Sequence, residues 1–244
     1  MLRRINFGDY DLIITFFTKD RGKVSAIAKS AKKSIKRFSG ILEHFSVLHI
    51  VCSSSRGKGL PVLQEAAMVK PFEHIRMDIN KTAYASYWIE LVGEWMEKNV
   101  KNVHVYHLLE YVLNALDTES ASLEALSILF QMRFMALSGL SPNLTCCSIC
   151  QTQTEEIKSE KVIFDFKKGR VACESCVSGS SHIYLSKGTV RQLQWIGDGD
   201  LKRAVRIRFA IQTLRESLNF LEVFVPYHIG REPKSLKFLR QIRG

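Results

Sequence analysis

The first seventy residues alternate apolar and polar positions in short runs that turn residues separate. Asp11 to Thr18 is rich in β-branched and aromatic residues, the turn Lys19 to Gly22 follows, and Lys23 to Lys29 alternates again. Three further stretches have a strand-like composition: Leu2 to Phe7, Phe45 to Cys52 and Leu60 to Ala67. About five strands in this length indicate a small β-barrel of OB type over residues 1–70.

From residue 71 the apolar positions recur at helical spacing. Tyr84, Trp88, Leu91 and Trp95 form one stripe, and a second stripe runs from Val105 to Leu116. The stretch from Ser120 to Leu137 is apolar on nearly every face, which predicts a helix at the centre of a bundle. Gly139 and Pro142 then block its continuation.

The C-terminal part is helical by the same criterion. Apolar residues recur from Ile207 to Leu221, which predicts an amphipathic helix that Pro226 ends, and Pro233 opens a short basic helix. The fold class is therefore α+β, with an OB-type barrel followed by a helical domain over residues 71–244. An insert at residues 143–181 projects from that helical domain.

The insert carries two C-x2-C pairs, Cys147 with Cys150 and Cys173 with Cys176. Each pair turns two thiolates toward one point, and a hairpin over residues 162–172 returns the chain to the second pair. Four thiolates predict one structural Zn²⁺ with no open position for water. Cys146 and His182 remain alternative ligands, and two unrelated thiol pairs are the competing interpretation.

Charge is divided unevenly along the chain, whose net charge is +11. Residues 1–70 hold 13 Lys and Arg against 5 Asp and Glu, residues 71–142 hold 5 against 9, and residues 182–244 hold 12 against 5. The insert between them is balanced at 5 against 5. The basic ends predict binding to a polyanion, and a solvated basic face without a partner is the alternative.

A cluster of cations between residues 29 and 37 is the strongest nucleic-acid signal, because like charges at this density favour a phosphate backbone. Tyr10 and Phe38 are candidate rings for base stacking, and Phe38 packed beneath the loop is the alternative. The predicted DNA contacts are Arg4, Tyr10, Lys23, Lys29, Lys32, Lys33, Lys36, Arg37, Phe38, Arg56 and Lys58. A second patch for DNA or a partner peptide comprises Lys202, Arg203, Arg206, Arg208 and Arg215, placed in one helix.

Signatures of other functions are missing from the sequence. It contains no P-loop, no HExxH and no G-x-S-x-G, and we therefore expect neither an enzyme nor a small-molecule substrate. It has no apolar run long enough to span a membrane. Cysteines in metal spacing fit a reducing compartment, which predicts a cytoplasmic protein associated with the nucleoid and without a membrane partner.

Several strings, in this order, resemble the RecO recombination and repair mediators of bacteria over essentially the whole chain. The strings are Phe7-Gly-Asp9-Tyr-Asp11, Thr15-Phe-Phe-Thr18, Gly22-Lys23-Val24, Ala28 to Lys33, Tyr84-Ala-Ser-Tyr87 and Gly139 to Leu144 before Cys147. One departure is Ser30, which stands where the family commonly has Gly. Either the turn differs there or the strand runs on.

The resemblance implies a protein that binds single- and double-stranded DNA and anneals complementary strands. It also implies partners: RecR, the C-terminal tail of single-strand-binding protein and, indirectly, RecA, which the family helps to load. The charge pattern alone also permits an RNA-binding or ribosome-associated OB-fold zinc protein.

Overall fold

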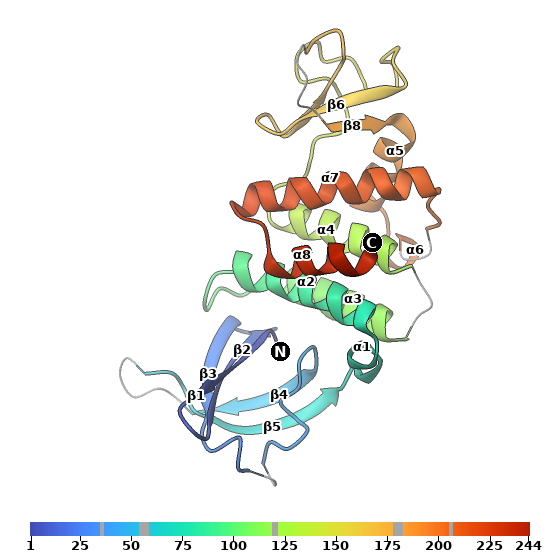
Figure 1. Cartoon of the computed structure of the whole chain (residues 1–244). Coiled ribbons are helices and arrows are strands. Elements are labelled where there is room, and N and C mark those ends of the chain that lie inside the picture. Colours follow the sequence, from blue (N-terminus) through green and yellow to red (C-terminus); the bar gives the residue numbers. More distant parts are fainter. Residues whose placement is uncertain (35–36, 54–58, 119–121, 178–182, 205–206) are drawn as a thin grey trace. The chain divides into compact units, whose positions relative to one another are not determined.

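The computed structural model describes residues 1–34, 37–53, 59–118, 122–177, 183–204 and 207–244. The chain forms two compact units (Figure 1). The first contains Met1–Glu119 together with Pro233–Gly244, and the second contains Ser120–Glu232. No helix in the described ranges has the length and apolar character needed to cross a bilayer.

The first unit begins with five strands that match the five predicted stretches. They are β1 (Arg3–Phe7), β2 (Asp11–Thr18), β3 (Gly22–Ala28), β4 (Val47–Cys52) and β5 (Leu63–Lys70). β1, β2 and β3 form one antiparallel sheet and β4 pairs with β5, while a bridge between Ile27 and Val62 links the two sheets. The β-rich N-terminal part is thus confirmed. β1 pairs with β2 alone among the described strands and forms a sheet edge.

The core of this β-rich part follows the two-residue period of β2. Leu12, Ile14 and Phe16 are buried on one face of that strand, against Ala26 and Ala28 of β3. β3 ends at Ala28, and Ser30 then adopts the left-handed conformation with φ of 54°. Ser30 therefore forms the turn in which the family commonly has Gly, and the strand does not run on. The Ser30 backbone N–H donates to Asp11 Oδ1 at 2.7 Å.

The helices of the first unit are α1 (Glu73–Met77), α2 (Ile79–Trp95), α3 (Val103–Thr118) and the C-terminal α8 (Lys234–Arg243). Asp78 caps α2 by accepting from the backbone N–H groups of Asn80 and Lys81. α8 lies beside α2 (Figure 1). The Glu90 carboxylate of α2 accepts from the first two N–H groups of α8, where the helix dipole favours negative charge.

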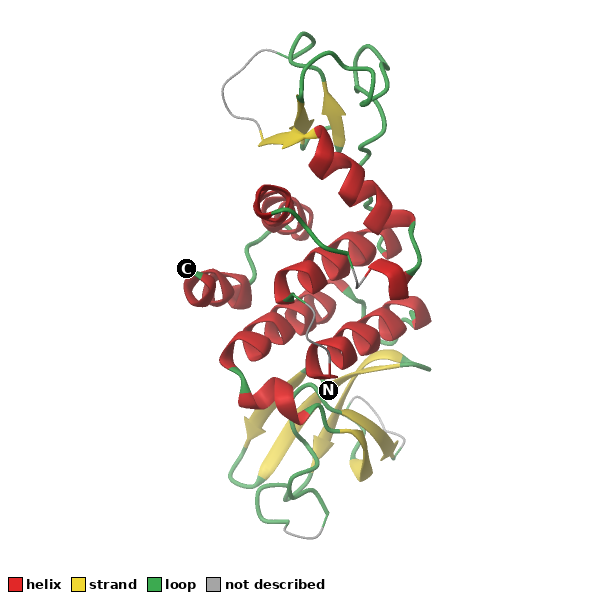
Figure 2. Cartoon of the chain, turned by 90° about the vertical axis from the view of Figure 1, so that its right-hand side faces the viewer, coloured by secondary structure: helices red, strands yellow, loops and turns green. Residues whose placement is uncertain are grey.

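The second unit comprises the helices α4 (Leu123–Leu137), α5 (Lys187–Asp198), α6 (Leu201–Ala204) and α7 (Ile211–Ile229) with the strands β6 (Lys161–Asp165), β7 (Arg170–Ala172) and β8 (Ile183–Ser186). The strand order is β7-β6-β8, and the short sheet lies at one end of α5 (Figure 2). α4 is buried on nearly every face, as predicted, and packs against α7.

Two predictions about α7 are wrong. The helix begins at Ile211 and not at Ile207, because residues 207–210 are not helical and Ala210 is extended. The stretch from Arg206 to Phe209 alternates charged and apolar residues with the period of a strand.

Pro226 lies inside the helix, which ends only at Gly230 with φ of 80°. A proline removes one donor, and its effect is limited here because the helix stops within one further turn.

Candidate metal centre and basic surface

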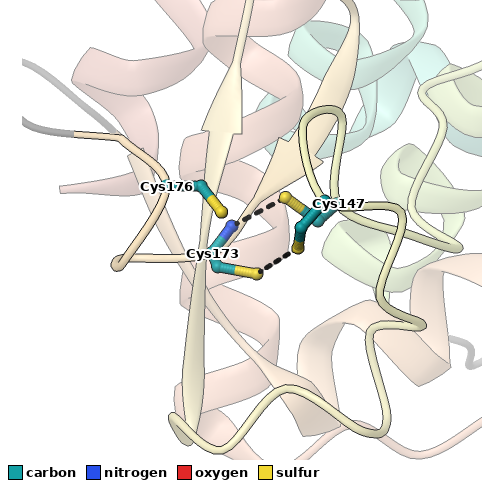
Figure 3. A group of neighbouring side chains, drawn as sticks. Cys147, Cys173 and Cys176 are labelled. Carbon is teal, nitrogen blue, oxygen red and sulfur yellow. Dashed lines mark hydrogen bonds between the residues drawn. The ribbon is translucent and has the colours of Figure 1, made fainter.

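Two tight turns hold the four cysteines of the insert (Figure 3). In the first turn the Gln151 N–H donates to Cys147 O, and in the second the Cys176 N–H donates to Cys173 O at 3.0 Å. The turns are joined because the Ser148 N–H donates to Val171 O on β7 at 2.8 Å. The β6–β7 hairpin thus brings the pairs opposite each other, as the spacing predicts.

The four sulfur atoms fit a tetrahedral metal ion. All four Sγ atoms lie within 4.8 Å of one another, and the Cys150 and Cys173 sulfurs are 3.5 Å apart. A tetrahedron with metal–sulfur distances of about 2.3 Å has sulfur–sulfur edges of roughly 3.8 Å. The arrangement therefore matches a four-thiolate site whose sulfur–sulfur distances need only small adjustments around an ion.

The neighbouring groups favour thiolates at two of these positions. Burial alone would raise the pKa of Cys147, but backbone N–H groups, including those of Ile149 and Cys173 at 3.4 Å, hold it below its usual value. Hydrogen bonding from Thr152 lowers the pKa of Cys150 to about 6. Burial and the adjacent sulfurs raise the pKa of Cys173. A divalent cation would offset the repulsion between neighbouring thiolates, which are the form of cysteine that binds metal.

Cys146 is not a member of the cluster. Its Sγ lies 3.5 Å from the Gln151 side-chain oxygen, whereas the group of four is formed without it. The other alternative ligand, His182, lies outside the described residues. The ligand set Cys147, Cys150, Cys173 and Cys176 is the one that the geometry brings together.

The insert is anchored to α7 by aromatic packing. Phe164 of β6 is fully buried, and its ring contacts Phe220 and Phe224 with centroid distances of 4.7 and 5.6 Å. Lys187 donates to the backbone carbonyls of Glu155 and Ile157, which fixes the segment before β6. No sequence pattern signals this role of Lys187, because both carbonyls are some thirty positions away in the chain.

Part of the predicted basic cluster is exposed at one end of β3. Lys29, Lys32 and Lys33 are all exposed, and the turn at Ser30 presents them. The Lys33 ammonium lies 3.5 Å from the centre of the half-exposed Tyr10 ring. The turn thus exposes three lysines, one of which lies against an accessible aromatic ring.

Other predicted contacts are used inside the fold. Lys23 donates to Gly93 O at 2.6 Å, and burial holds its pKa below the usual value. Arg37 donates to the carbonyls of Leu63 and Gln64 on β5, and Arg4 donates to Leu42 O at 2.9 Å. Lys36, Arg56 and Lys58 lie outside the described residues.

Phe38 is not an exposed stacking ring in this structure. Only 4% of it is accessible, because it packs in the core with Leu12 and Leu42 under the loop that follows β3. The structure therefore shows the alternative interpretation, a ring packed beneath the loop. Apolar burial outweighs the exposure suggested by the adjacent charges.

The prediction that one helix carries the second basic patch is wrong. Lys202 and Arg203 belong to α6, Arg208 precedes α7, and Arg215 lies within α7. The reason is the break at residues 207–210, which separates the cations into three segments. Arg203, Arg208 and Arg215 are exposed, and Arg206 lies outside the described residues.

Comparisons with known proteins cover the whole chain. A family described as Recombination protein O N terminal matches residues 1–72, and one described as Recombination protein O C terminal matches residues 76–237. The protein named DNA repair protein RecO from Desulfatibacillum aliphaticivorans is 42% identical over 245 residues, covering 100% of this chain and 95% of the relative. The chain belongs to the RecO family. A RecO protein from Desulfosudis oleivorans is also 42% identical, covering 100% and 96%, and one from Syntrophus aciditrophicus is 32% identical, covering 100% and 94%.

Membership of the RecO family agrees with the architecture. The N-terminal match ends at residue 72, just before α1, and the C-terminal match begins at residue 76 within α1, so the boundary falls where the β-rich part gives way to helices. The four-cysteine cluster lies within the RecO C-terminal match. The chain is thus a RecO DNA repair protein with a site suited to a metal ion.

Proposed function

We propose that this RecO protein binds single- and double-stranded DNA, anneals complementary strands and assists the loading of RecA onto DNA covered by single-strand-binding protein. The observation that carries the proposal is family membership over the full chain, together with the exposed cations at residues 29–33. Three exposed lysines, one of them against the Tyr10 ring, suit a phosphate backbone and a stacked base. No reaction is assigned to the protein, which acts by binding.

The proposed DNA contacts are the exposed side chains at the end of β3 and the half-exposed Tyr10 ring. Lys29, Lys32 and Lys33 would contact phosphates and Tyr10 would stack, while Arg4, Lys23 and Arg37 chiefly support the fold. Since phosphate contacts carry little sequence information, binding should depend weakly on base sequence.

One structural Zn²⁺ would be held by Cys147, Cys150, Cys173 and Cys176, and would fix the insert. Four thiolates leave no position for water, so the ion would supply stability and not chemistry.

The exposed arginines Arg203, Arg208 and Arg215 are proposed to bind the acidic C-terminal tail of single-strand-binding protein or a second DNA strand. RecR is the further proposed partner.

Strand annealing tests the proposal. Two complementary labelled oligonucleotides are mixed with and without protein, and the protein is expected to accelerate duplex formation without ATP. Binding of a single strand and of the duplex is measured in parallel, with RNA of the same sequence as competitor. Absence of binding to either DNA form, or stronger binding to the RNA, would contradict the proposal.

A further inference from the structure

A cavity of about 530 Å³ opens between β1 and the segment that follows β3. Its wall on β1 is formed by Arg4 and Asn6, which pair across the sheet with Ile14 and Leu12 of β2. Cross-strand partners lie on the same face of a sheet. Arg4 and Asn6 therefore lie on the inward face of β1, where β2 carries buried apolar residues.

The cavity combines an apolar floor with a polar rim. Leu12, Phe38 and Leu42 line it and are each less than 10% accessible. Among the residues that the structure describes, none hydrogen-bonds to the Asn6 side-chain amide, which offers a donor and an acceptor at the opening. A size of several hundred Å³, an apolar floor and a few convergent polar groups are typical of small-ligand sites.

Charge decides which part of a ligand enters. The Glu43 carboxylate lines the cavity and pairs with Arg4 at 3.4 Å, which offsets the Arg4 charge and leaves Lys32 as the cation of the lining without an acidic partner there. Lys32 also lines it, and its ammonium donates to Gly8 O at 3.3 Å beside the β1–β2 turn. A flat uncharged group fits the interior, and an anion fits the neighbouring lysines.

We infer that this cavity receives one unstacked base of single-stranded DNA, while the lysines at residues 29–33 hold the adjoining phosphates. The base would contact Leu12 and Leu42, and its polar edge would meet the Asn6 amide. This inference rests on the proposed function and deepens it, because it separates a base-holding cavity from the cationic surface.

The test compares two oligonucleotides of equal length, one of thymidines and one in which every base is replaced by an abasic sugar. Wild-type protein is expected to bind the thymidine strand about fivefold or more tightly, as base contacts commonly provide. Ala31→Phe and Asn6→Phe fill the cavity from two walls without changing charge. Each is expected to reduce this preference to the part that stacking on Tyr10 provides, and to keep the affinity for the abasic strand.

Ala67→Phe is the matched control, since it adds the same ring to an exposed position on β5 and should leave the preference intact. Asn6 is exposed on an edge strand, so its variant should fold even where the half-buried Ala31 does not accept a ring. Equal affinity of wild type for both strands, or a preference that neither filling reduces, would overturn the inference while leaving DNA binding established. Binding of neither strand would overturn the proposed function as well.

Discussion

Replacing Cys147 with serine should weaken metal binding, lower the zinc content of the protein and loosen the second unit. Cys147 is fully buried, and its sulfur accepts two backbone N–H groups from the two turns that carry the cluster. Structural zinc contributes about 10–16 kcal/mol in zinc-finger peptides, so the loss of one ligand of four weakens it by roughly 2.5–4 kcal/mol. In a domain of about a hundred residues each kcal/mol lowers Tm by about 4 °C, which gives a loss of roughly 10–16 °C.

The measurement is zinc content per chain by mass spectrometry, with thermal unfolding followed by calorimetry. Cys146→Ser is the matched control, because Cys146 is the adjacent residue and lies outside the cluster. It should retain one zinc per chain and the wild-type Tm. The reasoning is refuted if Cys147→Ser keeps one zinc and an unchanged Tm, or if Cys146→Ser loses the metal.

Three further predictions concern the fold. Ser30→Gly removes the strain of a left-handed non-glycine residue, about 1–2 kcal/mol, but glycine makes the unfolded chain more flexible, which costs about 0.4–1 kcal/mol of stability. Urea unfolding should therefore show a free energy of unfolding that is higher by about 0.5 kcal/mol, and a decrease would contradict this prediction. Burial would raise the pKa of Glu216, but Thr189 and Ser186 hydrogen bonds hold it below normal. Its stabilisation is present above the unfolded pKa and lost as pH falls through the folded one, so Glu216→Gln should cost about 1–2 kcal/mol at pH 7 and progressively less as pH falls through the folded pKa; a cost that does not change with pH would argue against this. Glu90→Ala should raise amide exchange selectively in α8, where unchanged exchange would show that its N-terminal contacts are dispensable.

Local patterns predicted the features that depend on neighbouring residues. The alternation in β2 follows from one buried face, and the four cysteines meet because two tight turns and a hairpin are encoded within thirty residues. Phe38 was ambiguous from the sequence, since its charged neighbours favour exposure and its ring favours the core. Only the packing against Leu12 and Leu42 decides between them.

Long-range contacts were beyond the reach of those patterns. α8 packs on α2 in the first unit, although about 140 residues separate Glu90 from Ser235. Pro226 is accepted within α7, and the apolar stripe predicted from Ile207 begins with residues 207–210, which lie outside the helix. Periodicity describes one helix at a time and does not report which helix it meets.

The salt dependence of single-strand binding tests the central claim most directly. Each phosphate contact on single-stranded DNA contributes about 0.7 to the slope of log affinity against log salt, so Lys32→Ala with Lys33→Ala should reduce that slope by about 1.4. Lys98→Ala with Lys101→Ala removes two equally exposed lysines of the same unit and should leave the slope unchanged. Equal slopes in all three proteins, or an affinity that does not respond to salt, would contradict the assignment of DNA binding to this surface.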